Sequence, residues 1–240
     1  MIDYSKELLF NEKISIKQSR DGYRFSIDPI ILANLVNPGN ASMIADFGTG
    51  SGIIPMVLCK RFSDISVVGF EIQKDLADLA DLNVSDNGLE NSVVIENLDI
   101  NNISERNLYD YVVSNPPYIK KGAGRINPVE ECAIARHEIK ITIKSLVSKA
   151  SDVLKKKGRL GVIYPAMRLD ELIHEFKNFG IAPKVLTIIY SKPMRDASLV
   201  FLEGVKGGKD ELKVTPPFYI YGDRDEYSEV MGNIIKGQFL

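Results

Sequence analysis

The chain of 240 residues contains few of the side chains that bind metal ions or cross-link a fold. It has two cysteines and two histidines, and the cysteines, Cys59 and Cys132, are far apart in the sequence. These four residues form neither a zinc-ligand spacing nor a disulfide framework. We therefore expect two free thiols and no metal site.

Long apolar runs and an export leader are also absent. No stretch reaches the roughly 18 apolar residues that a membrane-spanning helix requires. The first residues, Met1–Tyr4, lack the charged and then apolar pattern of a signal peptide. These absences predict a cytoplasmic protein without a membrane segment.

A strong excess of positive charge is missing as well. The formal net charge is −2 and the isoelectric point is about 5.8. Such a chain does not coat nucleic acid through bulk electrostatics, although local clusters of lysine and arginine can still contact it.

Strand-like and helical segments alternate through the middle of the chain. Strand-like runs are found near 42–46, 66–71, 92–96, 109–114 and 159–164, and helical patterns near 53–62, 74–87, 139–155 and 168–179. This alternation predicts an α/β fold with a mostly parallel sheet and helices on both faces. No helix separates the runs 184–191 and 197–204, so we expect a C-terminal antiparallel hairpin. Lys155–Arg159 is interpreted as a helix stop, with cations in the last turn and Gly158 after it.

The two ends of the chain are expected to form smaller elements. An Asp-Gly signal within Arg20–Gly22 predicts a hairpin between residues 8 and 26. Asp28 is suited to cap a helix over 29–36 that has Pro29 at its first position. After residue 209 an aromatic strand and a short helix near 226–235 are expected. We divide the chain into an N-terminal hairpin and helix (1–40), a core (41–208) and a C-terminal tail (209–240).

A glycine-rich loop follows the first core strand. Asp46 ends the strand, and Gly48, Gly50 and Gly52 follow at alternate positions. This loop is not the dinucleotide fingerprint, because Ile53 stands where the third glycine belongs and an acid is unfavourable beside a pyrophosphate. An acid suits a cationic amine, and the N–H groups of the loop suit a carboxylate. The ligand with both groups is an amino acid.

Acidic residues also follow the next two strands. Glu71 lies about 20 residues beyond the glycine loop, at the spacing of a carboxylate that binds ribose hydroxyls. Asp99 follows the third strand, where an acid can accept a hydrogen bond from an adenine amine. Each acid alone is more often a solvated strand end. Their regular placement indicates a ligand at the carboxyl edge of the sheet.

The segment Asn115-Pro116-Pro117-Tyr118 follows the fourth strand. The Asn115 amide oxygen and the Pro116 carbonyl, held by two prolines, form a rigid pair of acceptors for a planar NH2 group. Tyr118 is placed to stack on the flat system that carries the amine. An ordinary turn after a strand is the alternative, because Asn-Pro favours turns.

Taken in order and spacing, these motifs resemble the class I S-adenosylmethionine-dependent methyltransferases that act on planar amino groups. The flanking segments Gln18–Asp28, Ala135–Glu138 and Leu199–Gly208 resemble the tRNA(Val) adenine-N6 methyltransferase family. The resemblance covers roughly residues 5 to 210. It implies a Rossmann-like seven-stranded sheet in which the final hairpin inserts one reversed strand.

The resemblance also implies S-adenosylmethionine as the cofactor and a set of residues that bind it. These residues are Phe25, Asp28, Asp46, Gly48, Thr49, Gly50, Gly52, Glu71, Ile72, Asp99, Ile100 and Asn115. For Phe25 and Asp28, hairpin packing and helix capping are equally good explanations.

The implied substrate is an adenosine of tRNA, beside the anticodon of tRNA(Val), methylated at its exocyclic N6 amine. The catalytic residues are then Asn115, Pro116, Pro117 and Tyr118. Candidate RNA contacts are Lys120, Lys121, Arg125, Arg136, Lys192 and Arg195. The group Arg136-His137-Glu138 is expected to order a loop. We expect a monomer or a weak homo-oligomer.

Three other functions fit the same motifs. A glutamine carboxamide of a protein presents the same planar NH2 as adenine, and another RNA is an equivalent acceptor. About 40 residues precede the glycine loop, which favours nucleic acid over the protein-modifying family. A nonenzymatic module that binds the cofactor or RNA is disfavoured, because a degenerate enzyme is free to lose Asn115 and Tyr118.

Overall fold

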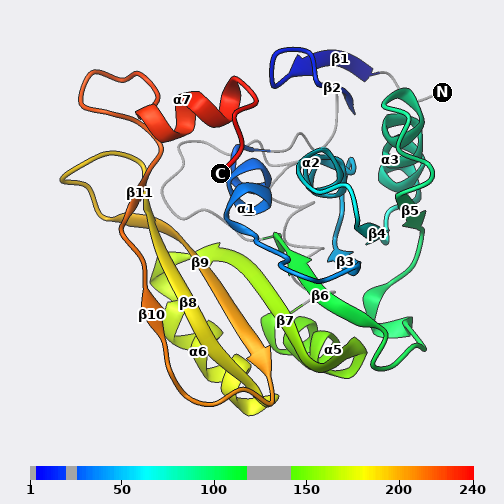
Figure 1. Ribbon diagram of the computed structural model, residues 1–240, viewed down its shortest axis with the longest axis vertical. Helices are drawn as coiled ribbons and strands as arrows, with labels where there is room; N and C mark the ends of the chain where they lie inside the picture. The colour runs from blue at the N-terminus through cyan, green and yellow to red at the C-terminus, as the bar shows by residue number, and fades with distance from the viewer. Residues whose placement is uncertain (1–3, 20–25, 118–141) are drawn as a thin grey trace, which may run out of the picture.

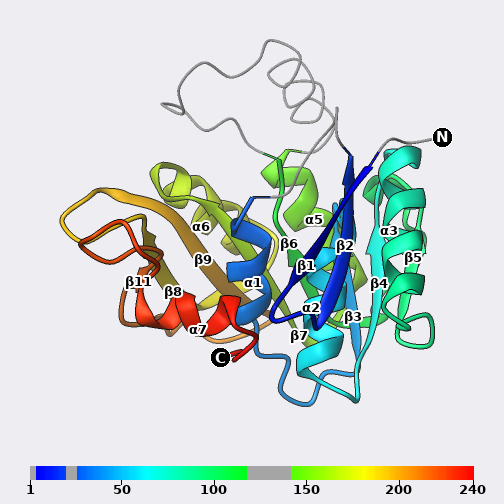
Figure 2. The same cartoon turned by 90° about the horizontal axis from the view of Figure 1, so that it is seen from above.

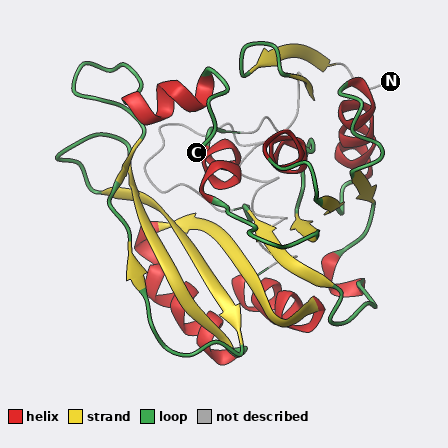
Figure 3. Cartoon of the chain, viewed as in Figure 1, coloured by secondary structure: helices red, strands yellow, loops and turns green. Residues whose placement is uncertain are grey.

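The computed structural model has one large sheet covered by helices on both faces (Figure 1). The described residues are 4–19, 26–117 and 142–240. Nine strands form this sheet, in the order β10-β8-β9-β7-β6-β3-β4-β5 with β11 also paired to β8. A separate antiparallel hairpin, β1 and β2, precedes it (Figure 3).

The strands within the described residues are β1 (Tyr4–Leu9), β2 (Ile14–Ser19), β3 (Met43–Phe47), β4 (Ser66–Phe70), β5 (Val93–Glu96), β6 (Tyr109–Ser114), β7 (Leu154–Pro165), β8 (Ile181–Tyr190), β9 (Ala197–Lys206), β10 (Lys213–Val214) and β11 (Phe218–Tyr219). The helices are α1 (Asp28–Leu35), α2 (Ile53–Arg61), α3 (Lys74–Asp86), α5 (Ile143–Val153), α6 (Leu169–Asn178) and α7 (Glu229–Ile235), with short 3-10 turns η1 (Ile100–Asn102) and η2 (Ala166–Arg168).

Two hydrophobic clusters lie on opposite faces of the sheet. Successive residues of a strand point to opposite faces, so Tyr111 and Val113 join one cluster and Val112 joins the other. The first cluster contains α1, α2, the β1–β2 hairpin and the tail, and the second contains α5 and α6. Figure 2 shows α7 beside α1, and β1 and β2 across α2.

The predicted mostly parallel sheet and C-terminal antiparallel pair are confirmed. Strands β3 to β7 pair in parallel, and β9 is antiparallel to both β7 and β8. The tail extends this sheet beyond the expected seven strands, because β10 and β11 pair in parallel with β8. The expected aromatic strand and short tail helix correspond to β11 and α7.

The N-terminal hairpin turns earlier than the Asp-Gly signal indicated. Strand β1 pairs with β2 across the residues between Leu9 and Ile14, whereas Arg20–Gly22 lies outside the described residues. Phe10, Asn11 and Glu12 all have positive φ, at 57°, 50° and 66°. Local preferences do not reveal this turn, because non-glycine residues rarely adopt that conformation.

The expectation that Asp28 caps α1 is wrong. Helix α1 begins at Asp28 itself, and its N-cap is Ile27, which has no capping side chain. The Asp28 N–H instead donates to the Ser26 hydroxyl, at 3.3 Å. Asp28 lies in the first turn, where a negative charge still interacts favourably with the helix dipole.

The helix stop proposed for Lys155–Arg159 is also wrong. Helix α5 ends at Val153, and β7 begins at Leu154, so the cations belong to a strand. The pairing with β6 shifts register between Tyr109 and Tyr111, and Lys157 has a positive φ of 67°. A bulge of this kind is determined by the neighbouring strand and is not visible in local helix-end rules.

A buried polar contact connects the strand that precedes Asn115 to β9. The Tyr111 hydroxyl donates to the Glu203 carboxylate at 2.7 Å, and burial raises the pKa of Tyr111 well above its ordinary value. Gly161 in β7 provides the space, because a Cβ at this position would lie 2.6 Å from the Tyr111 hydroxyl oxygen. The centre of the sheet is therefore tightly specified.

We predict that Gly161→Ala lowers the free energy of unfolding by roughly 2 kcal/mol or more, because it overpacks this site and displaces a buried hydrogen bond. Urea unfolding measures the change. Gly232→Ala is the control, since its added Cβ would meet no atom within 4 Å in helix α7. The control should be neutral or stabilising by up to about 1 kcal/mol. A Gly161→Ala protein as stable as wild type would contradict this account.

Candidate functional site

The predicted site residues meet at the carboxyl edge of the parallel strands. Strands β3, β4, β5 and β6 are parallel and in register, with Phe47 opposite both Phe70 and Ser114. Asp46 is the penultimate residue of β3, and Glu71, Asp99 and Asn115 follow β4, β5 and β6. Four motifs that are distant in sequence therefore share one edge.

The glycine loop is held against the end of β4. The N–H groups of Gly48 and Thr49 both donate to the Phe70 carbonyl, at 2.9 and 3.0 Å. Gly48, Gly50 and Gly52 have positive φ values of 79°, 58° and 84°, which other residues adopt at a cost. The loop backbone thus needs glycine at all three positions.

Four buried polar atoms around this loop have no hydrogen-bond partner. They belong to Asp46, Thr49 and Asn115: both carboxylate oxygens, the hydroxyl oxygen and the amide oxygen, respectively. Thr49 and Asn115 line a small pocket of about 30 Å³ together with Pro29, the remaining loop residues and the start of α2. Buried polar atoms are nearly always paired, so a cluster of unpaired ones indicates a site for a polar ligand.

Asp46 is the acid of this cluster, and it is fully buried. It is 0% exposed. Burial raises its pKa from 3.8 to about 7, the nearby charge of Glu71 adds to the rise, and the Thr49 hydroxyl opposes it. A cationic group placed beside Asp46 would favour the ionised carboxylate.

Glu71 connects the glycine loop to the end of β4. One carboxylate oxygen accepts from the Gly50 N–H at 3.0 Å and the other from the Gln73 N–H at 2.9 Å. Glu71 is 6% exposed. Each oxygen keeps a free lone pair, so a ligand hydroxyl can still donate to it.

The third acid lies at the start of η1. One Asp99 oxygen accepts from both the backbone and the side-chain nitrogen of Asn101, each at 2.9 Å. Ile100 is buried in the second hydrophobic cluster and Ile72 is half-buried. The side chain of Ile100 therefore packs in the core and is not available to a ligand.

Several predicted residues are not placed by the structure. Phe25, Tyr118, Lys120, Lys121, Arg125 and Arg136 lie outside the described residues. Asp28 is 3% exposed at the start of α1, next to Pro29 of the pocket wall.

Two of the predicted RNA contacts, Lys192 and Arg195, lie within the described residues and differ in their surroundings. Lys192 and Arg195 lie in the turn between β8 and β9, on the same edge of the sheet as Asn115. Lys192 forms an ion pair with Asp225 of the tail. Arg195 is exposed. Arg195 therefore remains the better of the two for contacting a substrate.

Sequence reasoning missed Ser114, the residue before Asn115. Its buried hydroxyl donates to the Phe47 carbonyl at 2.7 Å and so connects the end of β6 to the end of β3. This bond fixes the start of the Asn-Pro segment relative to the glycine loop. A serine at a strand end carries no local signal for such a role.

Other candidate sites in the described residues are weaker. A larger cavity of about 480 Å³ lies between the β1–β2 turn, Ile30 and Ile235, away from the strand ends. No group of three or more His, Cys, Asp or Glu side chains could hold a metal ion in that part of the chain. Its helices are also too short or too polar to cross a membrane.

Known structures share this fold. A structure titled as a predicted O-methyltransferase from Agrobacterium tumefaciens has a TM-score of 0.71 at 18% identity and covers 88% of this chain and 97% of its own. TYW2 from M. jannaschii, in complex with AdoMet, has a TM-score of 0.58 at 13% identity, covering 85% and 86%. At these identities the similarity concerns the fold.

Residues 28–181 match the family described as "Methyltransferase small domain". The chain belongs to this family.

Relatives of similar length support the resemblance to the tRNA(Val) adenine-N6 methyltransferases. Three of them are named tRNA1(Val) (adenine(37)-N6)-methyltransferase. The protein of Porphyromonas gingivalis is 28% identical over 201 residues, 80% of this chain and 78% of its own. That of Pedobacter heparinus is 25% identical over 233 residues, 95% and 96%. That of Trichodesmium erythraeum is 30% identical over 173 residues, 69% of each.

The residues present fit S-adenosylmethionine, the cofactor of this family. Its amino-acid end carries an ammonium group, for which the unpaired Asp46 carboxylate is a suitable partner. When bound, the cofactor supplies an electrophilic methyl group on a sulfonium. The small pocket matches one polar group of the ligand, and Glu71 and Asp99 lie along the open edge beyond it.

We predict that cofactor binding depends on pH through Asp46. The ionised carboxylate binds the ammonium group, so affinity for S-adenosylhomocysteine should rise roughly eightfold from pH 6 to 7.5 as Asp46 ionises. Titration calorimetry measures this rise.

Asp46→Asn is the matched control. It should weaken binding and abolish the pH dependence. The stability of the free protein should depend on pH in the opposite direction. The contribution of Asp46 to stability is present below about pH 4 and is lost as the pH rises to about 7, because its pKa is raised in the folded state. Equal pH dependence in both proteins would show that another group is responsible.

Proposed function

We propose that this protein transfers a methyl group from S-adenosylmethionine to the N6 amine of an adenosine in tRNA, beside the anticodon of tRNA(Val). Family membership supports methyl transfer, and the names of the relatives support the acceptor. A tRNA substrate also implies a cytoplasmic enzyme, and we infer a monomer or a weak homo-oligomer.

The observation that carries this proposal is the unpaired amide oxygen of Asn115. This oxygen is buried without a partner, and Asn115 lines the same pocket wall as Gly48–Ser51. The Ser114 hydroxyl bond to Phe47 holds the segment in this place. An acceptor so close to the glycine loop is suited to hold an amine near the methyl group.

The proposed mechanism relies on positioning rather than on a strong base. The lone pair of an aromatic amine is delocalised into the ring, which makes it a poor nucleophile. Two N–H bonds accepted by the Asn115 amide and the Pro116 carbonyl favour a pyramidal nitrogen with its lone pair directed at the methyl group. The nitrogen forms its bond to carbon as the carbon–sulfur bond breaks, and the extra proton then leaves to water.

Alignment of nitrogen, carbon and sulfur provides much of the rate. Holding the reactants in this geometry is worth roughly 7 kcal/mol or more in well-oriented intramolecular reactions. An adenosine in a loop leaves its stack at a lower cost than one in a duplex, which suits an anticodon loop. Tyr118, which lies outside the described residues, is proposed to stack on the base.

A glutamine carboxamide is the main alternative acceptor. It offers the same two N–H groups to Asn115 and Pro116, so the pocket wall does not separate the two substrates. A binding module without activity is the third possibility. It is disfavoured by the placement of both the donor loop and the acceptor oxygen on one pocket wall.

Transfer of a radiolabelled methyl group separates these three functions. The purified protein is incubated with labelled S-adenosylmethionine and either total tRNA or a protein extract. We expect label in tRNA, and mass spectrometry of tRNA from a deletion strain should show one missing N6-methyladenosine. Label in protein alone would support the carboxamide, and binding without transfer would support the module.

We predict that Asn115→Ala keeps its affinity for S-adenosylhomocysteine within about threefold but lowers kcat by a factor of about 100 or more, because the side chain contacts the nucleophile and little of the donor. Calorimetry and single-turnover transfer to tRNA measure the two quantities.

Asp46→Asn provides the complementary variant. It should weaken donor affinity and keep most of kcat when the donor is saturating, since Asp46 lies on the donor side alone. If Asn115→Ala weakened binding and turnover by equal factors, the assignment of Asn115 to the acceptor side would be wrong.

A further inference from the structure

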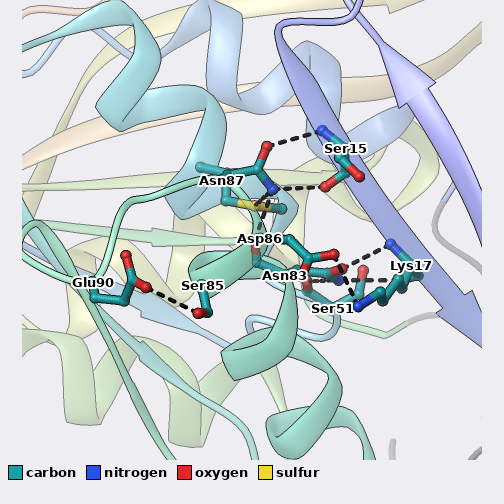
Figure 4. A network of polar contacts seen from close by, with 9 residues as sticks. Ser15, Lys17, Ser51, Asn83, Ser85, Asp86, Asn87 and Glu90 are labelled. Atoms are coloured by element: carbon teal, nitrogen blue, oxygen red, sulfur yellow. Dashed lines mark hydrogen bonds and ion pairs between the residues drawn. The ribbon is translucent and has the colours of Figure 1, made fainter.

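Asn83 of helix α3 and Asn87, the C-cap residue of this helix, face the free edge of strand β2 (Figure 4). The Asn83 amide accepts from the Lys17 N–H at 2.7 Å and donates to the Lys17 carbonyl at 3.0 Å. The Asn87 amide accepts from the Ser15 N–H at 2.9 Å and donates to the Ser15 carbonyl at 2.6 Å. Each side chain therefore pairs with β2 as a neighbouring strand would.

The spacing of helix and strand explains why this pairing works. Four residues of a helix advance about 6.0 Å, and two residues of a strand advance about 6.6 Å. Asn83 and Asn87, four residues apart, thus meet Lys17 and Ser15, which are two residues apart on β2. Asparagine is a weak helix former, so Asn83 in the interior of α3 indicates a role beyond helix formation, whereas Asn87 is the C-cap residue of the helix.

Asn83 makes one bond that Asn87 does not make. Its amide also donates to the Ser51 carbonyl of the glycine loop, at 2.9 Å. The N–H on the other side of the same peptide group belongs to Gly52 and donates to the Thr49 carbonyl at 3.0 Å. The peptide between Ser51 and Gly52 is therefore held on both sides, within the wall of the small pocket.

Burial makes this bond consequential. Asn83 is 0% exposed and Ser51 is 6% exposed. Without Asn83, the Ser51 carbonyl would be buried without its partner, or the peptide would rotate to find another. Rotation of that peptide would alter a loop whose backbone is already confined to glycine conformations.

Asn87 provides an internal comparison. Its further contacts are with the Asn83 carbonyl at 2.7 Å and the Met56 sulfur at 3.4 Å, both away from the loop. The ion pair between Lys17 and Asp86, at 2.9 Å, adds to the attachment of the hairpin and also does not reach the loop. Among these residues, Asn83 alone bonds to both the β1–β2 hairpin and the glycine loop.

We propose that Asn83 is a positioning residue of the cofactor loop, through which the β1–β2 hairpin and the Ser51–Gly52 peptide are energetically coupled. This inference rests on the proposed donor site at Gly48–Gly52. The coupling is reciprocal, so a ligand that orders the loop also stabilises the hairpin.

The first test compares three variants by calorimetry with S-adenosylhomocysteine and by thermal unfolding. Asn83→Ala removes all three bonds, and Asn83→Asp keeps the acceptor for the Lys17 N–H but loses the bonds donated to the Lys17 and Ser51 carbonyls. Asn87→Ala loosens the same hairpin without touching the loop. We expect both Asn83 variants to bind about tenfold more weakly and Asn87→Ala to bind within about twofold of wild type, although both alanine variants have lowered Tm.

Steady-state kinetics distinguishes positioning from general damage. Both Asn83 variants should raise KM for S-adenosylmethionine and leave kcat within about twofold at saturating donor, because Asn83 acts on the loop and not on the acceptor. A similar rise in KM for Asn87→Ala would reduce Asn83 to a structural role and overturn the inference.

Hydrogen exchange of the wild-type protein provides a measurement that does not require a variant to fold. Addition of S-adenosylhomocysteine should slow exchange of the Lys17 N–H severalfold, since this proton is bonded to Asn83. Unchanged exchange at Lys17 with bound ligand would overturn the coupling. Asp46→Asn separates this result from a failure of the donor site itself. If Asp46→Asn binds S-adenosylhomocysteine as wild type does, the donor site is misplaced. If Asp46→Asn binds weakly but the Asn83 variants bind normally, the donor site stands and the coupling is wrong.

Discussion

Burying a carboxylate without a partner is costly, and the free protein carries this cost at Asp46. The rise of its pKa from 3.8 to about 7 corresponds to an added cost of ionisation, relative to a carboxyl group in water, on the order of 4 kcal/mol. Neither carboxylate oxygen has a hydrogen-bond partner, and the Thr49 hydroxyl and the Asn115 amide oxygen are also unpaired. A cationic ligand group resolves this situation, which explains how an unfavourable arrangement in the free chain becomes favourable in the complex.

The sheet makes this arrangement possible because it brings distant segments to one edge. Parallel pairing places the ends of β3, β4, β5 and β6 together, and the Ser114 hydroxyl connects two of these ends directly. The loop is then held from three sides: by the Phe70 carbonyl, by the Glu71 carboxylate and by Asn83. Glycine residues are flexible in the unfolded chain, and these contacts with rigid elements hold the loop in one conformation.

Much of the fold and of the donor side of the site could be predicted from the sequence. The glycine loop, Glu71 and Asn115 follow strands with clear apolar patterns, so their positions depend on local signals. The turn at Phe10–Lys13, the β7 bulge and the bond between Asn83 and Ser51 could not be predicted, because each depends on partners distant in the chain. Asn83 did leave a weak signal, since asparagine is a poor helix former and this residue lies in the interior of α3.

The central claim is that Asp46 and Asn115 act on opposite sides of one ligand, the donor and the amine that it methylates. A crystal structure with bound S-adenosylhomocysteine tests this claim most directly. The account predicts the ligand ammonium group within hydrogen-bond distance of Asp46 and the ligand sulfur facing the Asn115 amide oxygen. A ligand bound in the larger cavity near the β1–β2 turn, or an Asn115 oxygen turned away from the sulfur, would contradict it.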